Sequence, residues 1–111
     1  MMHTIDRETL KQWMDEKRDI TLVDVLPADK FEDFHLPGAI NVPLDADFEM
    51  RIQEHFPDRF QAIVVYCYDH ECSASPRAAE TMQRLGYQKV YDYEAGKVDW
   101  RHAGFPVEEG A

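Results

Sequence analysis

Two cysteines and an arginine lie close together near the middle of the chain, in a segment suited to nucleophilic chemistry. Cys67 directly follows an apolar, β-branched run, Cys72 lies five positions later in a polar segment, and Arg77 comes next. Cysteine reacts as the thiolate, and a neighbouring arginine or a helix N-terminus lowers the pKa of the thiol. The pattern indicates either covalent catalysis by cysteine or, alternatively, a buried and unreactive Cys67 that ends a core strand.

The elements around these residues read as a strand, a loop and a helix. Residues 62–66 are typical of a buried strand, 68–76 of a polar loop, and 76–85 of a helix. The free N–H groups and the dipole at the start of such a helix favour an anion in the preceding loop. A thiolate at Cys67, or an oxyanion held by Arg77, would be stabilised there.

The rest of the chain alternates between helical and strand patterns. Helical patterns begin near residues 6, 27, 45, 76 and 98, and strand patterns cover 21–25, 39–42, 62–66 and 89–92. This alternation predicts a single α/β domain over residues 1–111 with a mostly parallel sheet. Ligands of such sheets bind at the carboxyl ends of the strands, which is where Cys67 lies.

Charge and cysteine content limit the partners and the setting. The 111 residues carry a net charge of −10, which argues against nucleic acid or an anionic membrane as the main partner. No apolar run has membrane-spanning length and the first residues do not resemble a secretory signal, so a cytoplasmic protein is expected. Two cysteines make no disulfide framework, which predicts unpaired thiols in a reducing compartment. His70 and Cys72 lack the companions of a zinc site, and neither metal nor cofactor is expected.

Three segments of the chain resemble the rhodanese-like family of single-domain proteins. They are 22–25 with 35–43, then 64–67 with 77–79 and 85–87, and finally Gly96, Trp100 and 103–107. The resemblance implies a mainly parallel five-stranded sheet flanked by helices on both faces. It also implies a sulfurtransferase, in which a cysteine takes sulfane sulfur from thiosulfate, polysulfide or a low-molecular-weight persulfide and passes it to cyanide or a thiol.

The resemblance also implies where the site lies. The expected catalytic residues are Cys67, Cys72 and Arg77. The residues expected to bind or admit the substrate are Tyr68, Asp69, His70, Glu71, Ser73, Ala74 and Ser75. The expected partners are a small anionic sulfur donor, a thiol acceptor and a sulfur-acceptor protein. The two acids of this loop oppose an anionic donor by charge repulsion.

Two criteria disagree about which cysteine carries the sulfur. Cys67 has the position directly after the strand, whereas Cys72 has the five-residue spacing to Arg77 that is usual in the family. We favour Cys67 because the sheet fixes the floor of the loop while the length of the loop varies. Cys72 is then either a resolving thiol that attacks a persulfide on Cys67 or a loop residue without a role. Mild oxidation is expected to join the two cysteines if their Cα atoms lie within roughly 4.4–6.8 Å.

Two other functions stand as alternatives. The acidic loop suggests a protein-binding or sulfur-relay module of the same fold, without useful turnover on small donors. A cysteine phosphatase-like enzyme would also combine a thiolate with an arginine, but residues 68–76 contain no glycine that would let backbone amides converge on phosphate. The second alternative therefore ranks last.

Three residues outside the loop have expected structural roles. Asp24 ends an apolar strand, so its carboxylate is expected to anchor backbone amides or an arginine. His35 is expected to hold its own loop by hydrogen bonds. Gly38 lies between Pro37 and Ala39 at a turn where a positive φ is expected.

Overall fold

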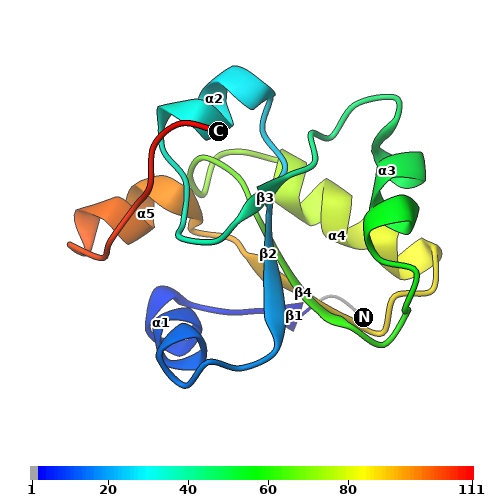
Figure 1. The fold of residues 1–111 in the computed structure, drawn as a ribbon, viewed down its shortest axis with the longest axis horizontal. Coiled ribbons are helices and arrows are strands. Elements are labelled where there is room, and N and C mark those ends of the chain that lie inside the picture. The colour runs from blue at the N-terminus through cyan, green and yellow to red at the C-terminus, as the bar shows by residue number, and fades with distance from the viewer. Residues whose placement is uncertain (1–2) are drawn as a thin grey trace.

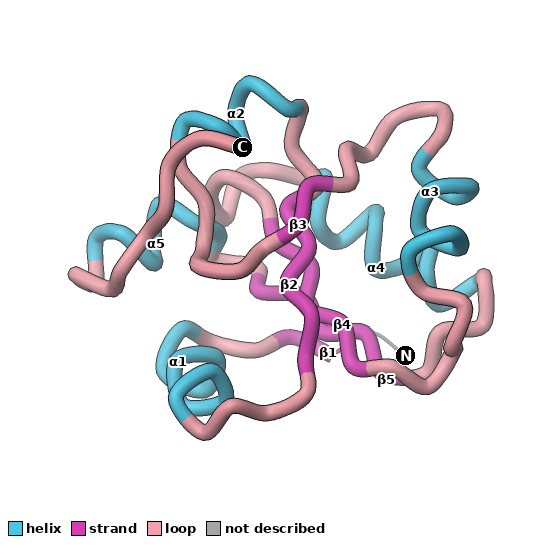
Figure 2. The backbone as a smooth tube through the Cα atoms, in the orientation of Figure 1, coloured by secondary structure: helices cyan, strands magenta, loops and turns pink. Residues whose placement is uncertain are grey.

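The apolar run before Cys67 forms the middle strand of a parallel sheet in the computed structural model, which describes residues 3–111. The strands are β1 (His3–Thr4), β2 (Ile20–Asp24), β3 (Ile40–Asn41), β4 (Ala62–Tyr66) and β5 (Lys89–Tyr93). Their order in the sheet is β1-β5-β4-β2-β3, and every neighbouring pair is parallel. Figure 2 shows the strands as a magenta layer between the helices. The prediction of an α/β fold with a five-stranded sheet is confirmed.

Helices cover both faces of this sheet (Figure 1). They are α1 (Arg7–Asp15), α2 (Ala28–Asp33), α3 (Phe48–His55), α4 (Ala74–Arg84) and α5 (Gly96–His102). Ile63 and Val65 of β4 pack in the core cluster that α3 and α4 complete, whereas Val64 and Tyr66 pack with residues of α1, α2 and α5. Because β4 is covered on both faces, its sequence shows no alternation of apolar and polar residues.

The sheet places Cys67 at its carboxyl edge, at the end of the middle strand. β4 lies between β2 and β5, and its five residues pair in register with both neighbours. Cys67 is the first residue after β4 and belongs to the same buried cluster as Val65. The floor of the loop is therefore fixed by two neighbouring strands, as the sequence analysis assumed.

The structure differs from the sequence-based boundaries at several elements. Nearest the cysteines, α4 begins at Ala74 rather than at residue 76, so Ala74 and Ser75, expected in the loop, belong to the first turn of the helix. β1 has no counterpart in the prediction, since two residues are too few to show a strand pattern, and it adds to the edge of the sheet beside β5. α3 begins at Phe48 rather than at residue 45, and α5 begins at Gly96 rather than at residue 98. None of the helices in residues 3–111 has the length and apolar character needed to span a bilayer. Met1 and Met2, part of the segment compared with secretory signals, lie outside the described residues.

Candidate active site

Cys67 and Cys72 are joined by a disulfide in this structure. Their Cα atoms lie 6.2 Å apart, within the range that a disulfide requires. Cys67 is buried, with only 1% of its surface exposed, and Cys72 is partly exposed above it. The prediction of unpaired thiols is wrong for this structure, because the short loop returns Cys72 to the floor on which Cys67 lies. The conditional expectation of a bond between the two is met.

The stem of the loop is held by the start of α5. The Lys97 N–H donates to the Cys67 carbonyl at 3.1 Å, and the Val98 N–H donates to the Tyr68 carbonyl at 3.0 Å. Gly96 makes this approach possible, since a Cβ at its position would lie 2.6 Å from the carbonyl carbon and oxygen of Tyr68. Gly96 also has a φ of +82°, a conformation that other residues rarely adopt. Only glycine fits this position without moving the loop.

Asp69 shapes the middle of the loop. Its carbonyl accepts the N–H of Cys72 at 3.1 Å, and its carboxylate Oδ1 accepts the N–H of Glu71 at 3.1 Å. A side chain that bonds the backbone two residues later forms an Asx turn, which reverses the chain direction. Asp69 therefore turns Cys72 back toward Cys67 without any contribution from the sulfur atoms.

The other expected loop residues differ in exposure. Tyr68 has 42% of its surface exposed, and His70, Glu71 and Ser73 are also exposed. His70 Nε2 lies 3.9 Å from a carboxylate oxygen of Glu71. Ser75 is instead buried, with 1% exposed. The first four residues are accessible to a ligand, whereas the Ser75 side chain faces the interior of the protein.

A small cavity lies beside Tyr68. Its volume is about 190 Å³ and its lining residues are Leu26, Lys30, Asp33 and Tyr68. Leu26 follows β2 and Tyr68 follows Cys67, so the cavity lies at the carboxyl edge of the sheet. This is the edge at which open α/β sheets bind their ligands.

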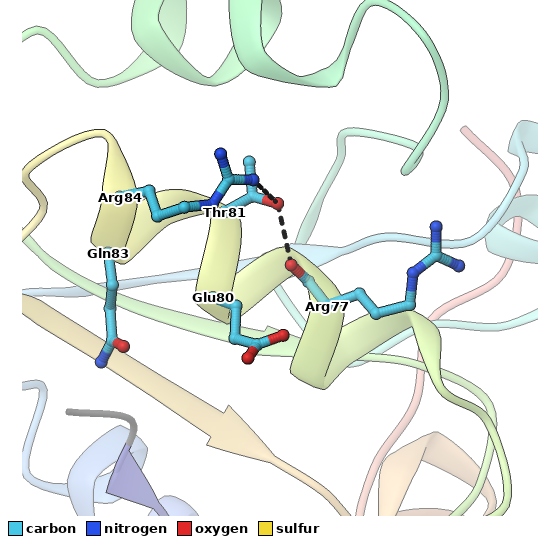
Figure 3. Close-up of a pocket in the computed structure, with 5 residues that line it drawn as sticks. All are labelled: Arg77, Glu80, Thr81, Gln83 and Arg84. Atoms are coloured by element: carbon cyan, nitrogen blue, oxygen red, sulfur yellow. Dashed lines mark hydrogen bonds between the residues drawn. The ribbon is translucent and has the colours of Figure 1, made fainter.

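Arg77 lies on the outer face of α4. It lines a surface depression together with Glu80, Thr81, Gln83 and Arg84, and its guanidinium extends away from Thr81 and Arg84 (Figure 3). The Arg77 carbonyl accepts the Thr81 hydroxyl at 2.9 Å. Within residues 3–111 no hydrogen bond or ion pair engages the Arg77 guanidinium, and nothing in the structure joins it to either cysteine. The depression along α4 is separate from the disulfide.

Asp92, for which no function was predicted, lies under the first turn of α4. Asp92 is fully buried in β5, opposite Val65 of β4, and neither of its carboxylate oxygens has a hydrogen-bond partner among the described residues. Burial raises the pKa of Asp92 to about 6, and the charge of Glu94 adds to this shift. The Ser75 hydroxyl favours the carboxylate electrostatically but does not reach hydrogen-bond geometry, and it too is unpartnered. The sequence did contain a signal for this buried acid, since an acidic residue lies inside the apolar strand pattern of residues 89–93.

A second buried polar group lies on the opposite face of the sheet. Asp24 Oδ1 accepts the N–H of Leu26 at 2.9 Å, which confirms the expectation that Asp24 anchors a backbone amide. Burial raises the pKa of Asp24, and the charge that opposes this shift most belongs to Lys97 rather than to an arginine. Lys97 is itself buried, and its Nζ donates to the carbonyls of Lys30 and Phe34 at 2.6 Å each. This lysine links α5 to the end of α2 and was not foreseen.

His35 has the structural role expected for it. Its ring stacks on Phe31 with centroids 3.9 Å apart, and Nδ1 donates to the Phe31 carbonyl at 2.8 Å. The backbone of His35 also exchanges two hydrogen bonds with Glu108. These contacts tie the C-terminal segment to the loop before β3. Among residues 3–111, no three side chains of His, Cys, Asp or Glu are grouped so that they could hold a metal ion.

Comparisons with known proteins identify the family and the fold. The family model described as "Rhodanese-like domain" matches residues 6–103. The solution structure of the rhodanese-like domain of the Anabaena sp. Alr3790 protein superimposes with a TM-score of 0.83 at 22% identity, covering 98% of this chain and 80% of that one. This likeness concerns the fold.

Curated relatives extend the comparison. The chain is 40% identical over 96 residues to the HTH-type transcriptional regulator Rv0324 of Mycobacterium tuberculosis, covering 86% of this chain and 41% of that protein. It is 31% identical to the putative sulfur carrier protein YrkF of Bacillus subtilis, covering 86% of this chain and 49% of that protein. A protein named sulfurtransferase from Allochromatium vinosum is 27% identical, covering 96% of this chain and 95% of its own. The chain thus spans less than half the length of the first two relatives.

Proposed function

Because this chain belongs to the rhodanese-like domain family, we propose that it is a sulfurtransferase that moves sulfane sulfur through a persulfide on Cys67. The proposal rests chiefly on the position of Cys67, which follows the central strand at the carboxyl edge of a parallel sheet. The relatives named sulfurtransferase and putative sulfur carrier support it. Residues 1–111 act in this proposal as a single rhodanese-like domain.

The chemistry begins with reduction of the Cys67–Cys72 disulfide. The freed Cys67 thiolate attacks the outer sulfur of thiosulfate, polysulfide or a small persulfide, and sulfite or the donor thiolate leaves. The product is a Cys67 persulfide, which then gives its outer sulfur to cyanide or to an acceptor thiol. The N–H groups at the start of α4, around Ala74 and Ser75, favour the anionic forms of the cysteine. A cytoplasmic setting, with its thiol reductants, suits a site that must be reduced first.

The remaining loop residues act on the substrate rather than on the sulfur. Tyr68, His70 and Ser73 are exposed around the disulfide and shape the approach of the donor. Asp69 and Glu71 repel anions and so oppose the approach of anionic donors such as thiosulfate. Arg77 is a cation without an acidic partner in the described structure, and it draws anionic donors toward a molecule of net charge −10.

The direct test is cyanide-dependent release of thiocyanate by the reduced protein. Thiosulfate, polysulfide and glutathione persulfide are supplied in turn, with Cys67→Ser as the matched control. Turnover with at least one donor, abolished in Cys67→Ser, is the expected result. Absence of turnover with every donor, together with no sulfur gained in the intact mass of either wild type or Cys72→Ser, would sink the proposal.

A second candidate is a sulfur-relay module that loads Cys67 but gives the sulfur only to a protein. The acidic loop favours this candidate because it discourages small anionic donors, and the likeness to a putative sulfur carrier adds to it. Stable loading of Cys67 without thiocyanate release, followed by transfer to an acceptor protein, would select the relay. Hydrolysis of an aryl phosphate that is lost in Cys67→Ser would instead favour the phosphatase alternative.

A further inference from the structure

The Cys67–Cys72 disulfide has no part in sulfur transfer through a single cysteine. Building on the proposed function, we propose that the protein also releases hydrogen sulfide. Cys72 attacks the Cys67 persulfide at its inner sulfur, expels hydrosulfide and forms the disulfide that the structure contains. The internal thiol thus replaces the external acceptor.

The reaction balances without any further oxidant. Thiosulfate and two cysteine thiols give sulfite, hydrogen sulfide and one disulfide. In the first step a sulfur–sulfur bond of thiosulfate breaks and the persulfide bond forms on Cys67. In the second step the persulfide bond breaks, the Cys67–Cys72 bond forms, and the hydrosulfide carries away the electron pair. The cysteines lose two electrons, and the sulfane sulfur gains them to become sulfide.

The loop is organised for the second step before the sulfurs bond. The Cys67 and Tyr68 carbonyls are held by the amides of Lys97 and Val98, and the Asp69 carbonyl is held by the amide of Cys72. None of these hydrogen bonds involves a sulfur atom, so reduction of the disulfide leaves them intact. A thiol held next to its target reacts at a high effective concentration, which a dissolved thiol does not match.

The geometry also selects the sulfur that is attacked. In the structure Cys72 is bonded to Sγ of Cys67 itself, which is the inner sulfur of a Cys67 persulfide. Attack at that atom expels hydrosulfide, whereas attack at the outer sulfur would move the sulfane sulfur to Cys72. Hydrosulfide is also a good leaving group, because it is less basic than an alkyl thiolate.

Burial supports an internal acceptor. Cys67 is 1% exposed, so an external thiol reaches its persulfide only where the outer sulfur projects from the loop. Cys72, by contrast, already lies beside the inner sulfur. The partly exposed Cys72 is in turn the accessible end of the disulfide. A dithiol reductant attacks Cys72, releases the Cys67 thiolate at the floor, and then closes its own disulfide to free the Cys72 thiol. The site is thereby ready for another donor.

The test follows the sulfur through one turnover. Fully reduced protein is freed of reductant under argon and given thiosulfate or glutathione persulfide, and sulfide, free thiols and intact mass are measured. Wild type is expected to release one equivalent of sulfide, lose both thiols and end at the mass of the disulfide form. Cys72→Ser and Cys72→Ala are expected to gain one sulfur and release no sulfide, and Cys67→Ser is expected to do neither. A dithiol should convert the single turnover into continuous sulfide release in wild type.

The outcomes separate this inference from the function on which it rests. A wild-type protein that keeps the added sulfur on Cys67, with Cys72 still a free thiol, would overturn the inference and leave the sulfurtransferase intact. Peptide mapping that places the sulfur on Cys72 would overturn the inner-sulfur attack. No sulfide from wild type, together with no sulfur gained by either Cys72 variant, would overturn the proposed function and this inference with it.

Discussion

At the scale of single residues, Asp92 is the least satisfied group in the described structure. It is fully buried, neither carboxylate oxygen has a hydrogen-bond partner, and burial raises its pKa from 3.8 to about 6. An acid whose pKa is raised by folding binds its proton more tightly in the folded state. The free energy of unfolding therefore falls as the pH rises from about 4 to about 6.

We expect Asp92→Asn to stabilise the protein at neutral pH and not at pH near 4. The gain at neutral pH should reach at most about 3 kcal/mol, from roughly 1.4 kcal/mol per pKa unit, because asparagine has no charge to bury. Urea unfolding across this pH range measures it, with Asp19→Asn as the control because Asp19 is exposed and does not act on Asp92. Identical pH profiles for wild type and Asp92→Asn would show that the carboxylate is not a source of instability.

Arg77 illustrates what sequence spacing can and cannot predict. Its spacing from the cysteines in the sequence suggested a catalytic partner. In the structure, however, the buried face of α4 is formed by Ala78, Ala79 and Met82, and Arg77 lies on the outer face. The helical spacing of the apolar residues already indicated that Arg77 is exposed, but the prediction used only its spacing from the cysteines. Its proposed part in attracting donors stays a prediction.

We expect Arg77→Gln to slow the reaction with thiosulfate a few-fold at low salt, through kcat/KM rather than kcat. A charge that only attracts a donor affects the encounter, and added salt screens it. Arg84→Gln is the matched control, since Arg84 lies on the same helix and the same depression. An equal loss with both variants would point to net charge alone, and a kcat loss that salt does not reduce would place Arg77 in contact with the substrate.

At the scale of elements, the contact between Gly96 and the cysteine loop was beyond prediction. The sequence showed a glycine near a turn, but the Tyr68 carbonyl that fills the space of its missing Cβ comes from a segment 28 residues earlier. β4 and α4 were predictable because their patterns are local. The proximity of Ser75 to Asp92 and the burial of Lys97 depend on which segments meet, and no local pattern in the sequence indicates that.

Gly96→Ala should displace the loop as well as strain the backbone. Gly104→Ala is a matched control, since Gly104 has a φ of +81° and no atom lies within 4 Å of the position that its Cβ would take. Each substitution is expected to cost about 1 kcal/mol for the positive φ, and Gly96→Ala should cost at least about 1–2 kcal/mol more because of the clash. Urea unfolding gives the cost. Sulfur loading, measured by intact mass with each substitution made in Cys72→Ser so that the sulfur is retained, should fall only with Gly96→Ala. Equal costs would mean that the loop moves aside freely.

Gly38 shows a turn whose geometry was predicted correctly. Its φ is +78°, and its N–H donates to a carboxylate oxygen of Glu108 at 3.0 Å. The glycine between Pro37 and Ala39 was sufficient to predict the positive φ, because turns with a positive φ favour glycine. The contact with Glu108, from the far end of the chain, was not visible in the sequence.

At the scale of the whole molecule, the disulfide closes only a short loop and so adds modest stability. A loop of this length gives about 2 kcal/mol in the chain-entropy treatment of cross-links. Reduction by a dithiol should therefore lower the free energy of unfolding by no more than about this amount and leave the protein folded. Thermal unfolding with and without the reductant measures the change, and Cys72→Ser should not respond to the reductant. Unfolding on reduction would show that the fold depends on the bond.

The hydrogen bonds that hold the loop to α5 also decide how the redox state of the cysteines can be communicated. The backbone around the cysteines is anchored by hydrogen bonds that do not involve the sulfur atoms, so we expect oxidation and reduction to leave the helices in place. The structural difference between the two redox states is then confined to the surface of the loop, around Tyr68 and His70. A partner protein that responds to the redox state therefore has to contact the loop directly, since no conformational change reaches the far side of the protein.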